Sequence, residues 1–146
     1  MARTSSKILN YTTTVSAQSS IAEIQRMLAQ AGATSVTMIY ESALPTGIEF
    51  SLLVGSNMFS FRLPCNMKGV VSVLAKAEPR YRRPEHIAAV SWRILKDWTE
   101  AQLAIIQAQM AQPSEVFFPY MLTAGGMTVY ERAAGQARGL LELRDE

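Results

Sequence analysis

Positively charged side chains gather in one short stretch of this 146-residue sequence, and they are its best candidates for binding a ligand. Residues 76–93 hold five basic and two acidic groups, a local charge of +3, whereas the whole chain carries +2 and the remainder therefore sums to about −1. Guanidinium groups match phosphate oxygens, and a tyrosine ring stacks on a nucleic-acid base. The residues predicted to bind single-stranded nucleic acid or a nucleotide are Lys76, Arg80, Tyr81, Arg82, Arg83 and Arg93. The alternative is a solvated connector in which Glu78 and Glu85 pair with the arginines.

No combination of residues predicts catalysis. His86 is the one histidine, and it falls in the first turn of a predicted helix, where a positive ring would oppose the helix dipole. Cys65 is the one cysteine and has no histidine near it in the sequence, so a buried structural role is the simpler interpretation. The chain has no glycine-rich phosphate loop, G-x-S-x-G motif or H-x-E motif. We therefore expect a non-enzyme without catalytic residues, metal or cofactor.

The acidic residues leave one alternative to this view. Ten Glu and two Asp are spread singly along the chain, whereas a metal-dependent nuclease needs clustered carboxylates. Glu41 and Glu49 are the best pair for folding to bring together, because they flank one predicted hairpin. A metal-dependent nuclease is therefore kept as an alternative function.

The first half of the chain predicts a sheet. Hydrophobic residues make up 49% and charged residues 18%, so we expect one folded domain over residues 1–146. A β-branched run predicts the first strand, and period-two alternation predicts three more. The predicted strands cover residues 8–15, 36–40, 48–54 and 59–63, with turns at 45–47 and 55–57.

Helices complete the predicted fold. Ser20 and Glu23 match a capping box that opens a helix ending at Gly32, and a short helix is expected over 66–76. Thr128 begins a second capping box for a last short helix. The expected fold class is α+β: a four-stranded, mainly antiparallel sheet in the order strand, helix, three strands, helix, followed by a long helix and short C-terminal helices.

The second half of the chain predicts a surface for self-association. Residues 1–76 are expected to contain the sheet, 77–83 to form a basic connector, 84–134 to be helical and 135–146 to be a fraying tail. Pro84 suits the first position of a long helix, which continues without Gly or Pro to about Met110. Its apolar band is wider than one small sheet needs, and aromatic residues follow it, so we expect a homo-oligomer. The predicted interface residues are Trp92, Trp98, Ile105, Phe117, Phe118 and Tyr120. The alternative is that the C-terminal segment of the same chain buries this band.

Polar residues suggest two further features. On the long helix, Arg93 with Asp97 and Lys96 with Glu100 have the i,i+4 spacing of ion pairs on a solvated stripe.

The polar face of the predicted sheet is a second candidate ligand surface, although an antiparallel sheet commonly turns such a face to solvent. This face is predicted to carry Thr12, Thr14, Ser35, Thr37, Ser51, Ser60 and Arg62.

Residues 89–120 resemble small uncharacterised proteins of phages and prophages, on the motifs SWRILKDWTEAQL at 91–103 and EVFFPY at 115–120. The resemblance implies a context, DNA metabolism or the blocking of host defence, and no activity or binding residue. The leading prediction is a non-catalytic, oligomeric phage-type accessory protein that binds single-stranded nucleic acid or a nucleotide. The alternative is an antagonist of host antiviral defence that sequesters a host protein or a nucleotide signal.

Hydropathy bears on location. No stretch approaches about 18 uninterrupted apolar residues, so we expect no membrane partner. Residues 1–7 are polar and no apolar run follows them, so we expect no signal peptide and a cytoplasmic protein, in the host cytoplasm if the chain is phage-encoded.

Overall fold

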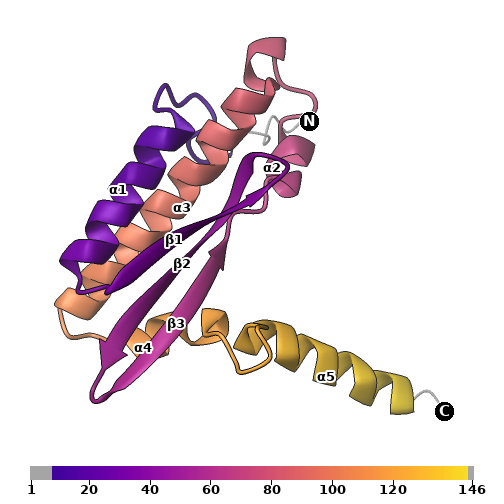
Figure 1. Ribbon diagram of the computed structural model, residues 1–146. Helices are drawn as coiled ribbons and strands as arrows, with labels where there is room; N and C mark the ends of the chain where they lie inside the picture. The colour runs from indigo at the N-terminus through magenta and orange to yellow at the C-terminus, as the bar shows by residue number, and fades with distance from the viewer. Residues whose placement is uncertain (1–7, 145–146) are drawn as a thin grey trace.

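The computed structural model describes the backbone of residues 8–144 and the side chains of residues 8–136. Figure 1 shows two long helices packed side by side next to a sheet, with a C-terminal helix that extends away from them. The elements in chain order are α1 (Ala17–Gln30), β1 (Ser35–Glu41), β2 (Leu44–Val54), β3 (Asn57–Pro64), α2 (Lys68–Val73), the 3-10 turn η1 (Pro79–Tyr81), α3 (Pro84–Gln107), α4 (Pro113–Phe117), the 3-10 turn η2 (Phe118–Tyr120) and α5 (Val129–Arg144). The expected α+β class and the start of the long helix at Pro84 are confirmed.

The expected four-stranded sheet is wrong, because within residues 8–144 the antiparallel sheet has three strands, in the order β1-β2-β3. The predicted strand at 8–15 is a turn-containing strap in which Tyr11 and Thr13 donate back to Ile8 and Asn10. Asn10 has a φ of 66°, outside the extended region. The strap is held on α3 through Asp97 and His86, so tertiary contacts override the β-branched composition of the segment.

The turn between β1 and β2 lies earlier than predicted. Ser42 and Ala43 have φ values of 51° and 68°, as the two central residues of a type I′ hairpin turn require. The predicted turn at 45–47 instead belongs to β2. Here the pairing with β1 is irregular, because Ile39 pairs with Gly47 and the next residue, Tyr40, pairs with Pro45. This irregularity accommodates Pro45, which has no amide to give to a regular ladder.

Helix α1 also begins earlier than the capping box at Ser20 predicts. Ser16 is the N-cap, and its Oγ accepts a 3.1 Å hydrogen bond from the Ser19 amide. Ser20 is a fully buried residue within the helix. Buried apolar spacing is therefore a better guide to this helix than the capping motif.

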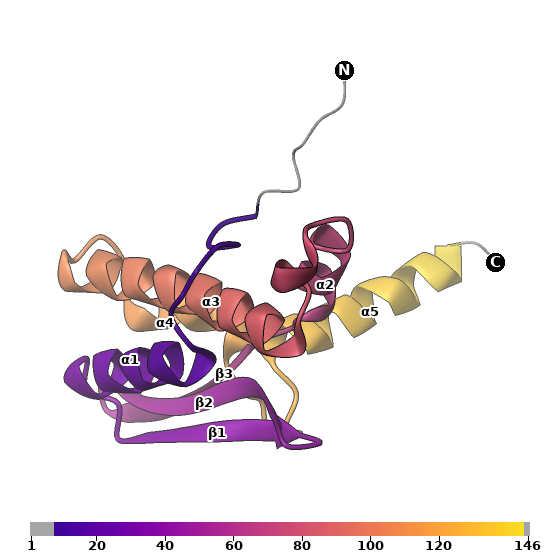
Figure 2. The same cartoon turned by 90° about the horizontal axis from the view of Figure 1, so that it is seen from above.

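Helices α1 and α3 lie on one side of the sheet and run parallel to each other (Figure 2). Ala17 shares a cavity with Pro84 at one end of the pair, and Met27 shares another with Ala104 at the opposite end. Both helix N-termini therefore lie at the same end of the molecule. Along the described residues, no helix has the length and hydropathy needed to cross a membrane.

Aromatic side chains form the centre of the core. The Phe50 ring lies 5.3 Å from that of Phe61 and 5.2 Å from that of Phe117, centroid to centroid. Trp92 is fully buried, and its indole Nε1 donates to the Pro45 carbonyl at 3.2 Å. This bond ties α3 to the start of β2.

The C-terminal segment turns back to the sheet before α5 begins. Helix α3 ends at Gln107, before the predicted Met110, and Gln109 follows with a φ of 61°. The second predicted capping box is confirmed: the Thr128 amide donates to Glu131 Oε1 at 2.8 Å, and the Glu131 amide donates to Thr128 Oγ1 at 3.2 Å. Helix α5 then continues to Arg144, past residue 135, where a fraying tail was expected to begin.

Candidate functional site

A cavity lined by two arginine side chains lies where α1 and α3 begin. Its volume is about 660 Å³, and its walls come from the strap, the first turn of α1, the β1–β2 hairpin and the first turns of α3. Its polar and charged lining residues include Thr13, Thr14, Ser16, Arg80, Arg83 and His86. We refer to this cavity as the N-terminal cavity.

Two arginines reach the N-terminal cavity from adjacent local structures. Arg80 lies in η1, and Arg83 is the N-cap residue of α3. Arg80 Nε lies 3.0 Å from Glu78 Oε2, but both side chains are about two-thirds exposed (66% and 67%). Exposed ion pairs of this kind contribute at most about 1 kcal/mol, so a ligand phosphate can compete for the guanidinium.

The first turn of α1 lies beside the same cavity. Amides in the first turn of a helix have no partner within the helix, and the N-terminal end carries partial positive charge. Ser16 caps the amide of Ser19, while Ala17 and Gln18 line the cavity. Because α3 begins at the same place, two helix dipoles present their positive ends together. Glu85 is the one acidic residue among those lining the cavity and partly offsets the two arginines.

His86 holds the wall of the cavity in place. Its Nε2 lies 2.5 Å from the Tyr11 carbonyl oxygen, and a carbonyl can only accept, so Nε2 carries a proton. The ring therefore anchors the strap to α3, the structural role that the sequence predicts. Thr13 and Thr14 are brought to the cavity by this anchored strap.

Tyr81 lies in a small aromatic cluster. Its ring centroid is 5.5 Å from Tyr11, edge to face, and 5.4 Å from His86. The Arg80 guanidinium carbon lies 4.7 Å from the same ring. Tyr81 therefore contacts the strap, α3 and Arg80, and it does not line the N-terminal cavity.

The six predicted ligand-binding residues therefore separate in space. Arg80 and Arg83 meet at the N-terminal cavity, while Lys76 and Arg82 are exposed and do not line it. Arg82 Nη1 reaches the Ala75 carbonyl at 3.5 Å. Arg93 pairs with Glu23 on α1 and is part of the packing between the two helices.

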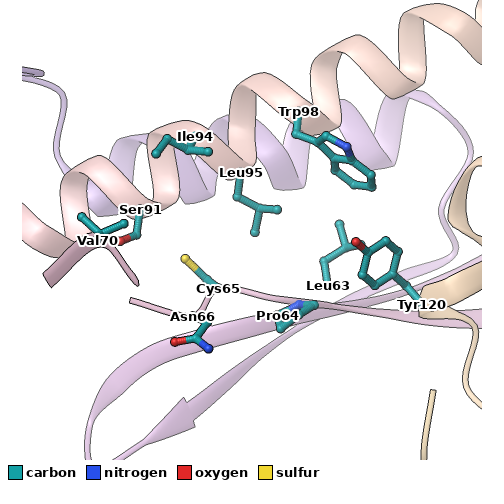
Figure 3. A pocket seen from close by; sticks show the side chains of 10 residues that line it. All are labelled: Leu63, Pro64, Cys65, Asn66, Val70, Ser91, Ile94, Leu95, Trp98 and Tyr120. Carbon is teal, nitrogen blue, oxygen red and sulfur yellow. The ribbon is translucent and has the colours of Figure 1, made fainter. Parts of the chain in front are cut away.

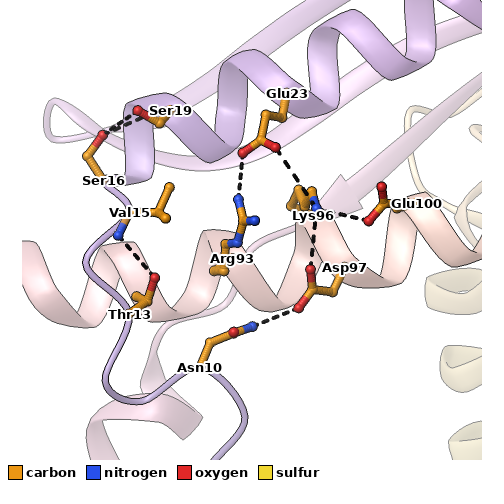
Figure 4. A network of polar contacts seen from close by, with 10 residues as sticks. All are labelled: Asn10, Thr13, Val15, Ser16, Ser19, Glu23, Arg93, Lys96, Asp97 and Glu100. Atoms are coloured by element: carbon orange, nitrogen blue, oxygen red, sulfur yellow. Dashed lines mark hydrogen bonds and ion pairs between the residues drawn. The ribbon is translucent and has the colours of Figure 1, made fainter.

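Charged side chains link α1, α3 and the strap, as Figure 4 shows. Arg93 Nη1 lies 2.5 Å from Glu23 Oε2, in place of the predicted pair with Asp97. Lys96 is buried, contrary to its predicted place on a solvated stripe, although its predicted pair with Glu100 is confirmed at 2.9 Å. The strap is joined to this network by Asn10, whose Nδ2 donates to Asp97 Oδ2 at 2.8 Å. The network stabilises the helix pair that carries the N-terminal cavity.

The predicted interface residues are also divided by the structure. Trp92 and Phe117 are fully buried in the core, so they have no surface left to contact another chain. Phe118 is 53% exposed, whereas Trp98, Ile105 and Tyr120 are half-buried. The alternative that the C-terminal segment of the same chain covers part of the helix is confirmed by the edge contacts of Trp98 with the Phe117 and Tyr120 rings, at 6.0 and 5.6 Å.

A second, smaller cavity of about 280 Å³ separates α3 from the end of β3 (Figure 3). Leu63, Leu95 and Trp98 make most of its lining apolar, and the Ser91 hydroxyl donates to the Ile87 carbonyl at 2.7 Å. Cys65 is also here, and burial raises the pKa of its thiol to about 12. A thiol that stays protonated at neutral pH is a poor nucleophile, and the cavity offers no base to activate it.

Carboxylates do not gather into a metal site in the part of the chain that the structure describes. No group of three His, Cys, Asp or Glu side chains there is arranged to hold an ion. Glu49 pairs with Arg62 on the outer face of the sheet at 2.9 Å, and Glu41 lies at the hairpin end of β1. The pair on which the nuclease alternative depends is thus absent among these residues.

The predicted polar face of the sheet is formed in part. Register and alternation place Ser51, Ser60 and Arg62 together on the face opposite the helices, and the Ser51 and Ser60 hydroxyls are 2.8 Å apart. Thr12 and Thr14 lie on the strap, away from this face. Since Arg62 is paired with Glu49, the face presents hydroxyls without an unpaired cation at that position.

The first turn of α1 and the strap also line the N-terminal cavity, which the sequence did not predict. The available signal was the Ser16-x-x-Ser19 spacing, which fits an N-cap as well as the box at Ser20 does. Comparison with known proteins adds no relative: neither a protein-family model, nor a curated protein, nor a solved structure matches the chain.

Proposed function

We propose that this chain is a non-catalytic binder of a phosphate-bearing ligand, a nucleotide or an end of single-stranded nucleic acid, held in the N-terminal cavity. The observation that carries the proposal is the convergence of Arg80 and Arg83 with the first turns of two parallel helices. Arginine forks and helix N-terminal amides both favour phosphate oxygens.

The size of the cavity favours a compact ligand. A volume of about 660 Å³ lies inside the range of about 300–1,000 Å³ that is typical of small-molecule sites. An extended strand would need a continuous basic groove, whereas Lys76 and Arg82 lie outside the cavity and Arg93 is paired with Glu23. A nucleotide, or the terminal phosphate of a strand, is the better fit.

The hydroxyl groups support recognition beyond charge. Thr13 and Thr14 line the wall beside the arginines, and a nucleotide has sugar hydroxyls and base edges that bond to such groups. The phage-type accessory role, with sequestration of a nucleotide signal as its anti-defence form, belongs to this proposal through the resemblance of residues 89–120.

Charge-reversal pairs of equal size test the site. Arg80→Glu with Arg83→Glu is compared with Lys76→Glu and Arg82→Glu, which changes the net charge equally outside the cavity. Calorimetric titration with nucleoside mono-, di- and triphosphates and with a 5′-phosphorylated oligonucleotide measures Kd. We expect the first variant to weaken binding at least tenfold and to flatten its salt dependence, and the second to change it little.

Three results would contradict the proposal. Equal loss in the two variants would show that net charge alone attracts the ligand, with no site at the cavity. Unchanged binding in the Arg80/Arg83 variant would place the ligand elsewhere, and no binding of any phosphate compound by the natural chain would refute the function. Circular dichroism of each variant verifies that the helices remain folded.

A further inference from the structure

Within the described residues, the C-terminal segment of the chain pairs with one edge of the sheet, and the other edge has no paired segment. Outside β3, the Leu122 amide donates to the Ser60 carbonyl at 2.8 Å and Met121 bridges to Phe61, so the C-terminal segment covers that edge. Strand β1 is the other edge, and within the described residues it pairs only with β2. A strand edge presents unpaired amides and carbonyls that readily pair with another chain.

The direction of the outward groups on β1 follows from the ladder. Since the Ser60 carbonyl bonds outward to Leu122, the backbone groups of Ser60 point away from β2. Ser51, opposite Ser60, must then bond to β1, where it is paired with Ser35. Because residues along a strand alternate in this respect, every second residue after Ser35 bonds to β2. The residues that point their amides and carbonyls outward are Val36, Met38 and Tyr40.

Strand β1 lacks the devices that usually prevent edge pairing. Its sequence, SVTMIYE, contains no Lys, Arg or Pro and is rich in residues that favour strands. The register shift of this hairpin leaves the extra residue, Thr46, in β2, so β1 itself continues without an insertion. Tyr40 is 59% exposed, a large aromatic side chain with little cover in the single chain.

We propose that two copies of this chain associate through β1, antiparallel about Met38, to form one six-stranded sheet. In this register Met38 lies opposite the partner's Met38, and Val36 lies opposite the partner's Tyr40. Both are pairs of outward-pointing residues, so each makes two backbone hydrogen bonds. An aromatic ring beside a β-branched residue is a favourable cross-strand pair.

The charges and the apolar side chains of β1 are consistent with this self-pairing. Glu41 is the one charged residue of the strand, and the register places it opposite the partner's Ser35, so the two carboxylates lie at opposite ends of the new ladder. Val36 and Met38 are half-buried on the helix side of the sheet, where Tyr40 also points. Pairing therefore continues the apolar face of one copy into that of the other. This partner is a second copy because one strand supplies complementary residues at every position.

The oligomeric state of matched variants tests the proposal. Sedimentation equilibrium of the full chain in the high micromolar range is expected to show a dimer. Met38→Pro removes an outward amide, which edge strands tolerate, together with a half-buried side chain, and Tyr40→Lys replaces the exposed ring with a charge without changing the backbone. We expect each to raise the dimer Kd about tenfold or more. Leu53→Lys is the control, since Leu53 is also 59% exposed but lies on the outer face.

Amide hydrogen exchange supplies a second readout. The amides of Val36, Met38 and Tyr40 should exchange slowly at high concentration and faster on dilution, while that of Thr37 should be slow at both. A monomeric natural chain at high micromolar concentration would overturn the proposal. So would a dimer that survives Met38→Pro and Tyr40→Lys, or one that Leu53→Lys dissociates, because either result would place the interface away from β1.

Discussion

Replacement of Lys96 by methionine should destabilise the protein more than replacement of an exposed charged residue would. The Lys96 side chain is 9% exposed, and its Nζ lies 2.9 Å from Glu100 Oε1, 3.6 Å from Asp97 Oδ1 and 4.0 Å from Glu23 Oε1. Methionine keeps the apolar stem of the side chain, so packing is nearly conserved and the loss isolates the charge. The three carboxylates would then share only Arg93 as a cation, together with the amide of Asn10.

The size of the effect follows from burial. Removing one partner of a buried ion pair costs about 3–5 kcal/mol, but these carboxylates are 31–59% exposed and partly screened, which lowers the expected loss to about 2 kcal/mol. At about 2–4 °C per kcal/mol for a chain of this length, Tm should fall by about 4–8 °C.

Urea unfolding monitored by circular dichroism measures this loss in the free energy of unfolding. Glu100→Gln is the matched control, because Glu100 is 59% exposed and its pair with Lys96 is worth less than about 1 kcal/mol. Adding Glu23→Gln to Lys96→Met should restore part of the stability by removing one uncompensated carboxylate. A free energy of unfolding for Lys96→Met within about 0.5 kcal/mol of the natural chain would refute this prediction. The Lys96 side chain would then contribute only through its apolar stem and not through its charge.

Three further predictions concern single positions. Ala43→Gly should stabilise the chain by about 1 kcal/mol in urea unfolding, because Ala43 has a φ of 68° that costs L-residues about 1–2 kcal/mol and glycine's extra entropy cancels only part of this; a loss of stability would contradict it. Burial raises the pKa of Cys65 from 9.0 to about 12, so the thiol ionises at lower pH in the unfolded chain than in the folded one. The free energy of unfolding should therefore fall as pH rises through that interval, and it should fall by more than in Cys65→Ala. Identical pH profiles of the two proteins would disprove this. The Thr128 backbone and side-chain hydrogen bonds lower the pKa of Glu131 below 4.5, so their support for α5 should be present above that pH and lost as pH falls. Glu131→Gln should weaken the dependence of helix content on pH in this range, as measured by circular dichroism, and an unchanged dependence would contradict this.

Local rules were sufficient where an element depends on its own residues. Pro84 begins α3 as its fixed φ predicts, and the Thr128 capping box forms because both of its partners lie within one turn. Alternation over β2 and β3 likewise predicts their buried faces, since side chains along a strand alternate between the core and the opposite side.

Local rules failed where distant residues decide between similar alternatives. Ser16 and Ser20 both suit an N-cap by residue type. Ser20 is buried with the apolar residues of α1, so the helix begins earlier and Ser16 is the cap. The strap at 8–15 has the composition of a strand, but its bonds to Asp97 and His86 hold it across α3. Lys96 and Glu100 have the spacing of a surface ion pair. In the structure Lys96 is buried between α3 and α1, where Glu23 also lies near its ammonium group.

The sequence by itself determined the α+β class, the main helices and the presence of a basic segment, because periodicity, proline positions and charge are properties of neighbouring residues. Only the tertiary structure decided which basic residues act together. Parallel packing of α1 and α3 brings both N-termini to Arg80 and Arg83, while Glu23 engages Arg93 more than two turns along α3. A charge count cannot distinguish these fates, because each depends on a contact with a residue far away in the chain.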